Sequence, residues 1–414
     1  MNTVVYSTLG FRATDAKPSS ALLRQALECA GRADWVSAYH ALQQAAENPA
    51  DSRCARFMLW EVCQALGHPD VALANLQAVL QDNPVTSRYS AAPRRRVLVL
   101  AVPGDFQANL PVGALLDATG TELHTLWLCE PEAILKNPRG AFKGCPPPFN
   151  CVFIAIAEDA RHQRALLAAD RLAETLGMPI INRGERIAAV SRAGAARLLQ
   201  NLPDAVVPLH TLIERDSLTS AAAGPMPEFP LIIRPSCSHA GKDLARLDDR
   251  AALRTYLDTV AGNLFYVAPF VDYRSADGFW RKYRLVFVGG RPWPYHLAIH
   301  SDWAIWYYNA RMDLEVWKRA EEARFLQDIR QAFPGRALAA LRTIGERVGL
   351  DYFGVDCGVL PDGRIVVFEI ETGMIVHDWD AIGAFTYKRD SVESIRRATE
   401  AMIDLSVAPA TVAA

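Results

Sequence analysis

The sequence predicts a protein of mixed α/β and α+β class, built from three consecutive parts. Residues 18–84 are rich in Ala and Leu and contain few β-branched residues, which favours helices. Further along, short apolar runs alternate with amphipathic helical segments, which indicates an α/β unit with a parallel sheet. The last part combines strand pairs in hairpin order with helices, which indicates an α+β unit. We therefore predict a helical segment over residues 1–90, an α/β domain over 94–206 and an α+β domain over 207–405.

The composition is that of a globular protein that stays in solution. Half of the 414 residues are hydrophobic, and 44 basic against 46 acidic residues leave a formal net charge of −2. This near-neutral balance argues against nucleic acid as a partner. The eight cysteines include no CxxC pair, the start of the chain has no secretory pattern, and no apolar run reaches the ~18 residues of a membrane span. We therefore expect a cytoplasmic protein with reduced thiols and no membrane partner.

The first part contains a helix pair with a defined turn. The stretch SRCARFMLWEVCQALGHPDVALANLQAVLQDNP predicts a helix, a turn at Gly67 and a second helix that ends at Pro84. The spacing from Gly67 to Ala72 to Pro84 resembles the tetratricopeptide repeat, whereas the preceding segment matches that pattern only loosely. Two functions stay open for these helices: support for the next domain, or recognition of a peptide or carrier protein.

The second part reads as a Rossmann-like α/β unit. RVLVLAV, NCVFIAIA and MPIIN are short apolar runs typical of parallel strands, and QRALLAADRLAETLG predicts a helix closed by Gly177. The unit lacks GxGxxG, so a dinucleotide-binding fingerprint is missing. The three arginines at 94–96 are expected to be a solvated entrance to the first strand.

The third part begins with FPLIIRPSCSHAGKDLARL, which predicts a strand ending at Arg234, a loop of small residues and a second strand. Such a loop allows backbone N–H groups to approach phosphate oxygens, and an ordinary β-turn is the alternative. NLFYVAPFVDY then predicts a strand leading into a turn, and WRKYRLVFVGGRPWPYHLAIH predicts a hairpin through Gly289-Gly290. The helix RALAALRTIGERVG carries an apolar stripe that we assign to the core.

The stretch FGVDCGVLPDGRIVVFEIE, residues 353–371, predicts a buried hairpin that carries acids. If its DG turn is a two-residue loop, Asp356 lies opposite Glu369, and Glu371 points to the same face as Glu369. Three carboxylates that converge in an apolar setting repel one another unless some are protonated or a cation lies among them. The alternative is an edge hairpin whose acids face water.

The order of these parts resembles that of the ATP-grasp ligases, a superfamily that includes glutathione synthetase, D-alanine:D-alanine ligase and the ligases that add glutamate to ribosomal protein tails. The shared features are the strand with its cation, the small-residue loop, the hinge strand, a strand carrying Arg, a helix, and GVDxG…DGR…FExE. PIINRGERIAAVSRAGAARLLQNLPDAVVPLHTLI is similar to that family's junction between its pre-ATP-grasp and nucleotide-gripping domains. The resemblance covers residues 95–400 and leaves out the helical start.

This resemblance implies an ATP-dependent ligase that activates a carboxylate as an acyl phosphate and joins it to an amine. ATP and Mg²⁺ are the expected cofactors, and a small-molecule or peptide carboxylate and an amine nucleophile are the expected partners. Two alternatives stay open: a non-catalytic ATP-binding scaffold that recruits a partner through its helices, and an ATP-grasp phosphotransferase. A homo-oligomer is also compatible with the sequence.

The resemblance also assigns ligands to the metal. Asp356 and Glu369 match the family's Mg²⁺ ligands, and Glu371 stands where the family usually has Asn. Glu supplies the hard oxygen that Mg²⁺ prefers, so two Mg²⁺ ions are expected between these acids and the phosphates. Arg192 and Arg234 stand where the family usually grips the α- and β-phosphates with lysines, with Arg197 as the alternative to Arg192.

The remaining nucleotide contacts follow from the hinge strand. Backbone groups of Tyr266, Val267 and Ala268 are expected to receive adenine, and Asp272 the ribose hydroxyls, although Pro269 stands where the family often has an acid.

Two further features complete the expected site. Ser238 and Gly241 belong to the small-residue loop over the phosphates, and Arg284 matches the family's arginine that faces the transferring phosphoryl group. The aromatic stretch 300–313 is a candidate loop over the substrate, and a loop of buried aromatics without function is the alternative.

Overall fold

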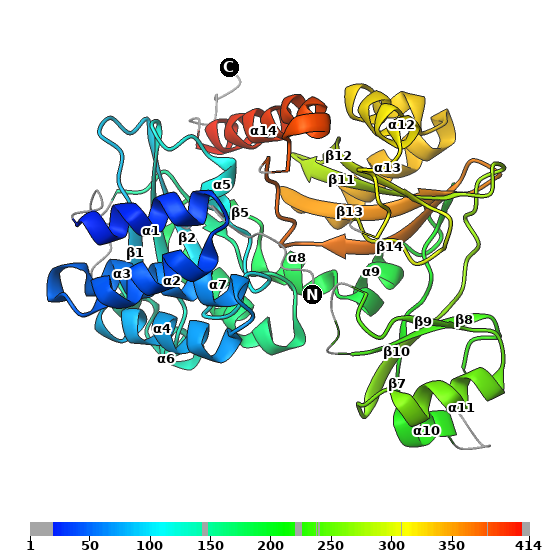
Figure 1. Cartoon of the computed structure of the whole chain (residues 1–414), viewed down its shortest axis with the longest axis horizontal. Helices are drawn as coiled ribbons and strands as arrows, with labels where there is room; N and C mark the ends of the chain where they lie inside the picture. Colours follow the sequence, from blue (N-terminus) through cyan, green and yellow to red (C-terminus); the bar gives the residue numbers. More distant parts are fainter. Residues whose placement is uncertain are drawn as a thin grey trace.

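Four helices, three β-sheets and the helices that cover them make up the molecule, which confirms the mixed α/β class (Figure 1). The computed structural model describes residues 20–142, of which 141 and 142 only in their backbone, 148–219, 226–236, 238, 241–307, 309–378 and 380–407.

The N-terminal segment forms two helix pairs. The predicted turn is confirmed, because Gly67 adopts a left-handed φ of 78° directly after the third helix and the His68 N–H donates back to the Cys63 carbonyl at 2.8 Å. In the first pair, the Asp34 side chain accepts a hydrogen bond from the Ser37 N–H at the start of the second helix. The helices are α1 Ala21–Gly31, α2 Trp35–Ala46, α3 Pro49–Ala65 and α4 Pro69–Asp82.

Helix α3 ties this segment to the α/β unit. Phe57 and Trp60 pack against Trp127 and Phe106, with the rings of Trp60 and Trp127 at 5.8 Å in an edge-to-face arrangement. Trp60 is 1% exposed, and its indole N–H donates to the Gly104 carbonyl at 2.9 Å. The helices therefore share one hydrophobic core with the following sheet, which favours the supporting role.

Trp60→Ala is expected to lower the free energy of unfolding by about 3–5 kcal/mol, because it leaves a cavity where α3 meets the sheet. Urea unfolding followed by circular dichroism measures the effect. The control is Val36→Ala on α2, where the side chain is 58% exposed and the change is expected to stay within about 0.5 kcal/mol. Equal midpoints for the two variants would contradict a shared core.

The parallel sheet follows in the order β1-β3-β2-β4-β5, with only the edge strand β1 antiparallel to its neighbour. The three predicted strands are present, and the predicted helix α7 Gln163–Leu176 ends at Gly177, whose φ is 64°. Two strands, β1 and β3, were not predicted. The strands are β1 Val85–Arg88, β2 Arg95–Ala101, β3 Thr121–Trp127, β4 Cys151–Ile154 and β5 Ile180–Ile181, and the shorter helices are α5 Val112–Leu115, α6 Pro131–Lys136, α8 Gly184–Ala189 and α9 Arg192–Leu198.

A small antiparallel sheet, called the outer sheet below, has the order β7-β10-β8-β9. Two helices cover one face and close a separate hydrophobic core with it. Figure 1 shows this unit apart from the helical segment, at the opposite end of the molecule. Its elements are β7 Thr211–Glu214, α10 Arg215–Thr219, β8 Leu231–Pro235, β9 Ala245–Leu247, α11 Arg250–Thr259 and β10 Leu264–Pro269.

The central sheet has the order β12-β11-β13-β14-β6 and is antiparallel except for the pair β14 and β6. Helix α13 packs its predicted apolar stripe on one face, where Leu341, Ile344 and Val348 are buried. Polar side chains of β11, β13 and β14 lie on the other face. The elements are β6 Ala205–Val206, β11 Trp280–Val288, β12 Arg291–His300, α12 Val316–Gln327, α13 Gly335–Val348, β13 Tyr352–Val359, β14 Ile365–Glu371 and α14 Arg389–Val407.

The turn of the acidic hairpin differs from the prediction. Its loop has three residues, 361–363, instead of two, and Gly363 closes it with a φ of 83°. The register then shifts at Phe368, which has no partner on β13. The loop and this bulge offset each other, so that Asp356 still lies opposite Glu369 as predicted.

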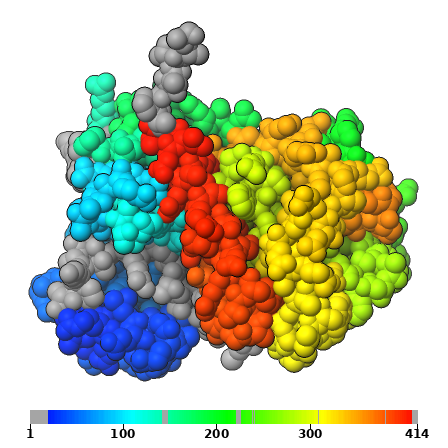
Figure 2. All heavy atoms as spheres, turned by 90° about the horizontal axis from the view of Figure 1, so that it is seen from above, coloured from blue at the N-terminus to red at the C-terminus, as the bar shows by residue number. Residues whose placement is uncertain are grey.

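Helix α14 bridges the α/β unit and the central sheet. Arg396 Nε donates to the Ala114 carbonyl in α5 at 3.1 Å, and Ser391 Oγ donates to the Pro294 carbonyl in β12. The space-filling view shows the helix (red) running along the seam between these two parts (Figure 2). No helix in the described ranges combines the length and the hydropathy that a membrane span requires.

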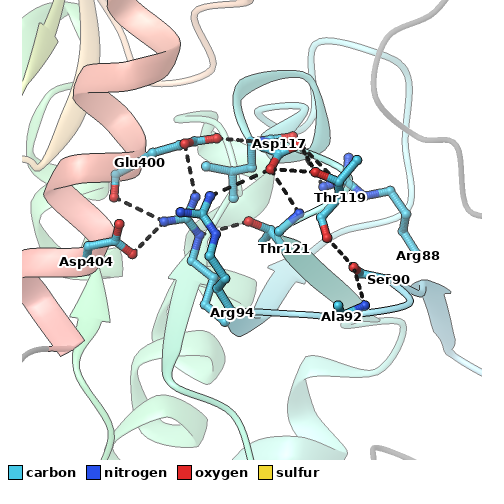
Figure 3. A network of polar contacts seen from close by, with 12 residues as sticks. Arg88, Ser90, Ala92, Arg94, Asp117, Thr119, Thr121, Glu400 and Asp404 are labelled. Atoms are coloured by element: carbon cyan, nitrogen blue, oxygen red, sulfur yellow. Dashed lines mark hydrogen bonds and ion pairs between the residues drawn. The ribbon is translucent and has the colours of Figure 1, made fainter.

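The expectation of a solvated strand entrance at 94–96 is wrong for Arg95, which is 3% exposed. Its guanidinium donates to Thr121 Oγ1 at 2.8 Å and forms ion pairs with Glu400 at 3.3 Å and Asp404 at 2.5 Å. Figure 3 labels these three partners. The positive charge therefore fastens α14 to the start of β2.

Candidate functional site

Three carboxylates lie on the polar face of the central sheet. Asp356 on β13 is directly opposite Glu369 on β14, and Glu371 is opposite Gly354. Asp356 is 2% exposed, whereas the two glutamates are half-buried. The alternative of acids facing water on an edge hairpin is therefore wrong for Asp356, since β13 is flanked by β11 and β14.

Cations of the chain itself neutralise two of these acids. Arg284 donates to both oxygens of Asp356, from Nε at 2.7 Å and from Nη2 at 2.9 Å, and Lys282 Nζ lies 2.6 Å from Oδ2. Arg192 Nη2 donates to Glu369 Oε1 at 2.6 Å. Burial opposes ionisation of Asp356, but the Arg284 and Lys282 charges outweigh it and hold the pKa of its carboxyl well below its usual range.

Glu371 differs from the other two acids. Its Oε1 accepts a hydrogen bond from the Gly373 N–H at 2.9 Å, while burial and the charge of Glu369 raise its pKa to about 7. Burial, Asp159 and the hairpin glutamates likewise raise the pKa of Glu158 to about 7. Negative charge therefore accumulates at this end of the site without full neutralisation.

The donor set fits Mg²⁺ in its chemistry, because carboxylate oxygens are the hard ligands that this ion prefers. The excess negative charge around Glu371 also favours a cation. In the arrangement that the structure shows, however, the described residues contain no group of three His, Cys, Asp or Glu side chains that could hold one metal ion. The oxygens of Asp356 and one oxygen of Glu369 are instead engaged by basic side chains.

Glu158 is a residue of the site that the sequence analysis missed. It follows β4 at the carboxyl end of the parallel sheet, where α/β proteins commonly bind ligands. Its N–H donates to Thr372 Oγ1 at 2.7 Å, and a Cβ at Gly373 would lie 3.1 Å from that of Ala157. The loop after β4 therefore packs directly against the end of the acidic hairpin.

Two guanidiniums, those of Arg192 and Arg234, lie near Glu369 of the acidic hairpin. Arg234 on β8 is opposite Tyr266 on β10, and its Nε donates to Ser238 Oγ at 3.1 Å. Its Nη2 is buried without a hydrogen-bond partner among the described residues. Burial and the charge of Arg192 lower the Arg234 pKa to about 10, and Arg192 itself lies 6.0 Å from the Tyr266 ring. This uncompensated positive charge favours an anion.

His210, also missed by the sequence analysis, lies close to these two arginines. Burial and the nearby Arg192 lower its pKa to about 4, so that the imidazole is neutral at pH 7. Its ring meets that of Tyr266 edge-to-face at 6.4 Å. Of the two arginines considered for the phosphates, Arg192 makes the ion pair with Glu369, whereas Arg197 is exposed.

The expected adenine strand is an inner strand of the outer sheet. Val267 and Ala268 of β10 are fully buried, and Tyr266 is half-buried. Asp272 lies beyond the strand in a turn, where its carboxylate accepts from the Arg274 N–H at 2.9 Å and from the Trp280 indole at 3.2 Å. The Asp272 side chain is thus engaged locally, and its ribose contact remains a prediction.

The small-residue loop and the aromatic stretch 300–313 lie side by side. Gly241 has a φ of 74°, and a Cβ there would lie 3.5 Å from the Trp306 ring. Ser238 is buried, whereas residues 237, 239 and 240 of this loop lie outside the described residues. At the other end, the Trp303 carbonyl accepts from the Tyr273 hydroxyl at 2.9 Å.

Buried polar contacts fix the far side of the aromatic stretch. Glu322 of α12, fully buried, accepts hydrogen bonds from the hydroxyls of Tyr307 at 3.0 Å and Tyr387 at 2.6 Å. The Lys388 ammonium lies 4.0 Å from the centre of the Tyr307 ring. The stretch is therefore held to the central sheet while Trp306 reaches the outer sheet.

No protein-family model matches this chain, and no curated protein is similar to it. Similar solved structures include a D-alanine–D-alanine ligase from Bacillus anthracis, with 14% identity and a TM-score of 0.45 over 76% of this chain and 97% of that one. VanG D-Ala:D-Ser ligase from Enterococcus faecalis has 14% identity and a TM-score of 0.44 over 75% and 99%. A RimK domain protein ATP-grasp from Sphaerobacter thermophilus has 18% identity and a TM-score of 0.42 over 76% and 100%.

Proposed function

We propose that this protein is an ATP-dependent ligase of the ATP-grasp type, which activates a carboxylate as an acyl phosphate and joins it to an amine. The observation that carries the proposal is that two guanidiniums, from β8 of the outer sheet and from the start of α9, lie next to the three carboxylates of the acidic hairpin. Arg234, whose buried Nη2 has no hydrogen-bond partner among the described residues, and Arg192 form a basic side. Three carboxylates of one hairpin form the acidic side. A metal-bound polyphosphate has the complementary charges for both.

The roles of the residues follow from this arrangement. Arg192 and Arg234 grip the α- and β-phosphates, with Ser238 and Gly241 in the loop above them. The backbone of Ala268, which pairs with β8 alone whereas Tyr266 and Val267 pair on both sides, receives adenine, and Asp272 binds the ribose. Charge-assisted hydrogen bonds and positioning of this kind are the main contribution that a protein makes to phosphoryl transfer.

The acids and Arg284 act at the reacting end of the nucleotide. Asp356, Glu369 and Glu371 hold two Mg²⁺ ions, which supply neutralisation of the phosphate charge when bound. Arg284 stabilises the transferring phosphoryl group. A carboxylate oxygen of the substrate forms a bond to the γ-phosphorus while the bond to ADP breaks, and the amine then displaces phosphate from the carbonyl carbon and loses a proton.

We assign the N-terminal helices a supporting role in this enzyme. Their core is continuous with the parallel sheet through Phe57 and Trp60, whose burial leaves these side chains without surface for a peptide. The parallel sheet in turn contributes Glu158 to the site.

Arg234→Ala is expected to lower nucleotide affinity by about tenfold or more, because a hydrogen bond to a charged group contributes about 1.5–3 kcal/mol. Calorimetric titration with ATP measures this effect. Arg254→Ala on the exposed surface of α11 is the matched control and is expected to bind ATP as the wild type does. Unchanged ATP affinity in Arg234→Ala would remove Arg234 from the nucleotide site.

The reaction itself is tested by screening amino acids and peptides for release of ADP, with mass spectrometry of the mixtures that stimulate turnover. A product that contains a new amide, formed together with phosphate, supports the ligase. Phosphorylated substrate without an amide would identify a phosphotransferase instead. ATP binding without ADP release under any mixture would identify a scaffold.

A further inference from the structure

The side chains expected to bind phosphate are bonded to the side chains expected to bind metal. Arg192 lies on Glu369 at 2.6 Å, and Arg284 lies on Asp356 at 2.7 and 2.9 Å. Lys282, which has no role in the proposed function, lies on the same carboxylate of Asp356 at 2.6 Å. Each of these acidic groups already has the charge of a cation beside it.

Strand β11 positions Lys282 for its contact with Asp356. It lies two residues before Arg284 on β11, so both side chains point to the polar face of the central sheet. The Lys282 side chain is 25% exposed, whereas that of Asp356 is 3% exposed. Lys282 therefore reaches from a partly exposed position onto a buried carboxylate.

The charges of this cluster disfavour binding of either ligand alone. Lys282, Arg284 and Arg192 bring three positive charges to the two carboxylates of Asp356 and Glu369, so the excess negative charge of the site lies at Glu371 and Glu158 and not at these two groups. A divalent cation alone therefore meets the repulsion of these basic side chains at Asp356 and Glu369, where the carboxylate oxygens are already engaged. A polyphosphate alone meets Arg234, but it finds Lys282, Arg284 and Arg192 already paired with carboxylates.

We propose that these ion pairs exchange partners when metal and nucleotide enter together, and that Lys282 is a positioning residue for this exchange. In the nucleotide-free protein, Lys282 and Arg284 hold the oxygens of Asp356. On binding, the carboxylates turn to the metal, and the released basic side chains turn to the phosphate oxygens. Metal and nucleotide therefore bind with strong positive coupling, which is reciprocal by necessity. The inference rests on the proposed function.

Mn²⁺, which electron paramagnetic resonance detects directly, and ADP are the probes for this coupling. Lys282→Met is expected to bind Mn²⁺ in the absence of nucleotide about tenfold or more tightly than the wild type, because one competing charge next to Asp356 is gone. The factor by which Mn²⁺ raises the affinity for ADP is expected to fall in the variant. Lys282→Arg, which keeps the charge, is expected to retain the coupling of the wild type.

The matched control is Arg281→Met. Arg281 is the neighbour of Lys282 on the same strand, but it points away from the site to Asp277 at 2.7 Å and Glu321 at 2.5 Å. Arg281→Met removes these ion pairs and leaves the contacts of Asp356 unchanged. The Mn²⁺ affinity and the coupling between Mn²⁺ and ADP are therefore expected to stay as in the wild type. Lys282→Gln replaces Lys282→Met if the apolar side chain impairs folding.

Equal Mn²⁺ affinity in the wild type and Lys282→Met would overturn the exchange while leaving the proposed ligase intact. A merely structural ion pair would lower the melting temperature of Lys282→Met and leave the Mn²⁺ affinity unchanged, which is the same negative result. The proposed metal site fails in a different way: Mn²⁺ then binds none of these proteins, even with saturating ADP.

Discussion

Arg284→Ala is expected to lower the rate of ADP release by about a thousandfold or more, the range found when an arginine that faces a transferring phosphoryl group is removed. The guanidinium lies next to the carboxylate expected to hold metal, and the Arg284 side chain is 37% exposed. ATP affinity, measured by calorimetry, is expected to change by only a few fold, because the contact becomes important in the transition state.

Two control variants separate the role of Arg284 from stability. Arg284→Lys keeps the charge without the planar fork and is expected to retain more activity than Arg284→Ala. Arg281→Ala removes an arginine from the opposite face of β11 and is expected to release ADP at the wild-type rate once saturated with substrates. A wild-type rate in Arg284→Ala would show that the phosphoryl group is transferred elsewhere.

Glu369→Gln is expected to abolish ADP release, again by about a thousandfold, because a lost metal ligand removes several kcal/mol of charge stabilisation. The fold is expected to persist. The variant loses the ion pair to Arg192 at 2.6 Å, but it also relieves repulsion with Glu371. ADP release and thermal shift across a Mg²⁺ titration measure both effects.

Two companion variants and the pH dependence sharpen this experiment. Glu371→Asn is expected to be milder than Glu369→Gln, and Asp356→Asn to weaken metal binding without unpairing the hairpin.

Metal-free wild type is expected to lose stability as the pH rises from about 4.5 to about 7, because folded Glu371 keeps a proton that the unfolded chain releases. The loss of stability over this pH range is expected to be smaller in Glu369→Gln, because the Glu369 charge that helps to raise the Glu371 pKa is gone. Full activity of Glu369→Gln at ordinary Mg²⁺ would refute the metal site and with it the main support for the ligase.

The acidic hairpin shows how far the sequence predicts this site. Alternation along two apolar strands was enough to bring Asp356, Glu369 and Glu371 to one face. The predicted pairing of Asp356 with Glu369 is confirmed, although the loop is longer than predicted and a bulge at Phe368 restores the register. Such offsetting irregularities depend on packing across the sheet, which a local pattern does not contain.

Residues that act only through tertiary contacts escaped the sequence analysis. Lys282 has the sequence context of any basic strand residue, and its role depends on the buried carboxylate of the next strand. His210 lies between strands without a motif. Glu158 had a usable signal, because it follows an apolar strand of a parallel sheet at the end where ligands bind. Strand β3 was missed because its polar residues, including His124, are buried through mutual hydrogen bonds.

The distribution of the hydrophobic cores determines how the molecule unfolds. The parallel sheet and the central sheet share two clusters of buried side chains, and the N-terminal helices join the parallel sheet through a third. The outer sheet has a cluster of its own. Arg234 and Tyr266 therefore belong to one cooperative unit and the acidic hairpin to another. A ligand that bonds to both sides joins the two units, so that separate melting steps merge into one as the site fills.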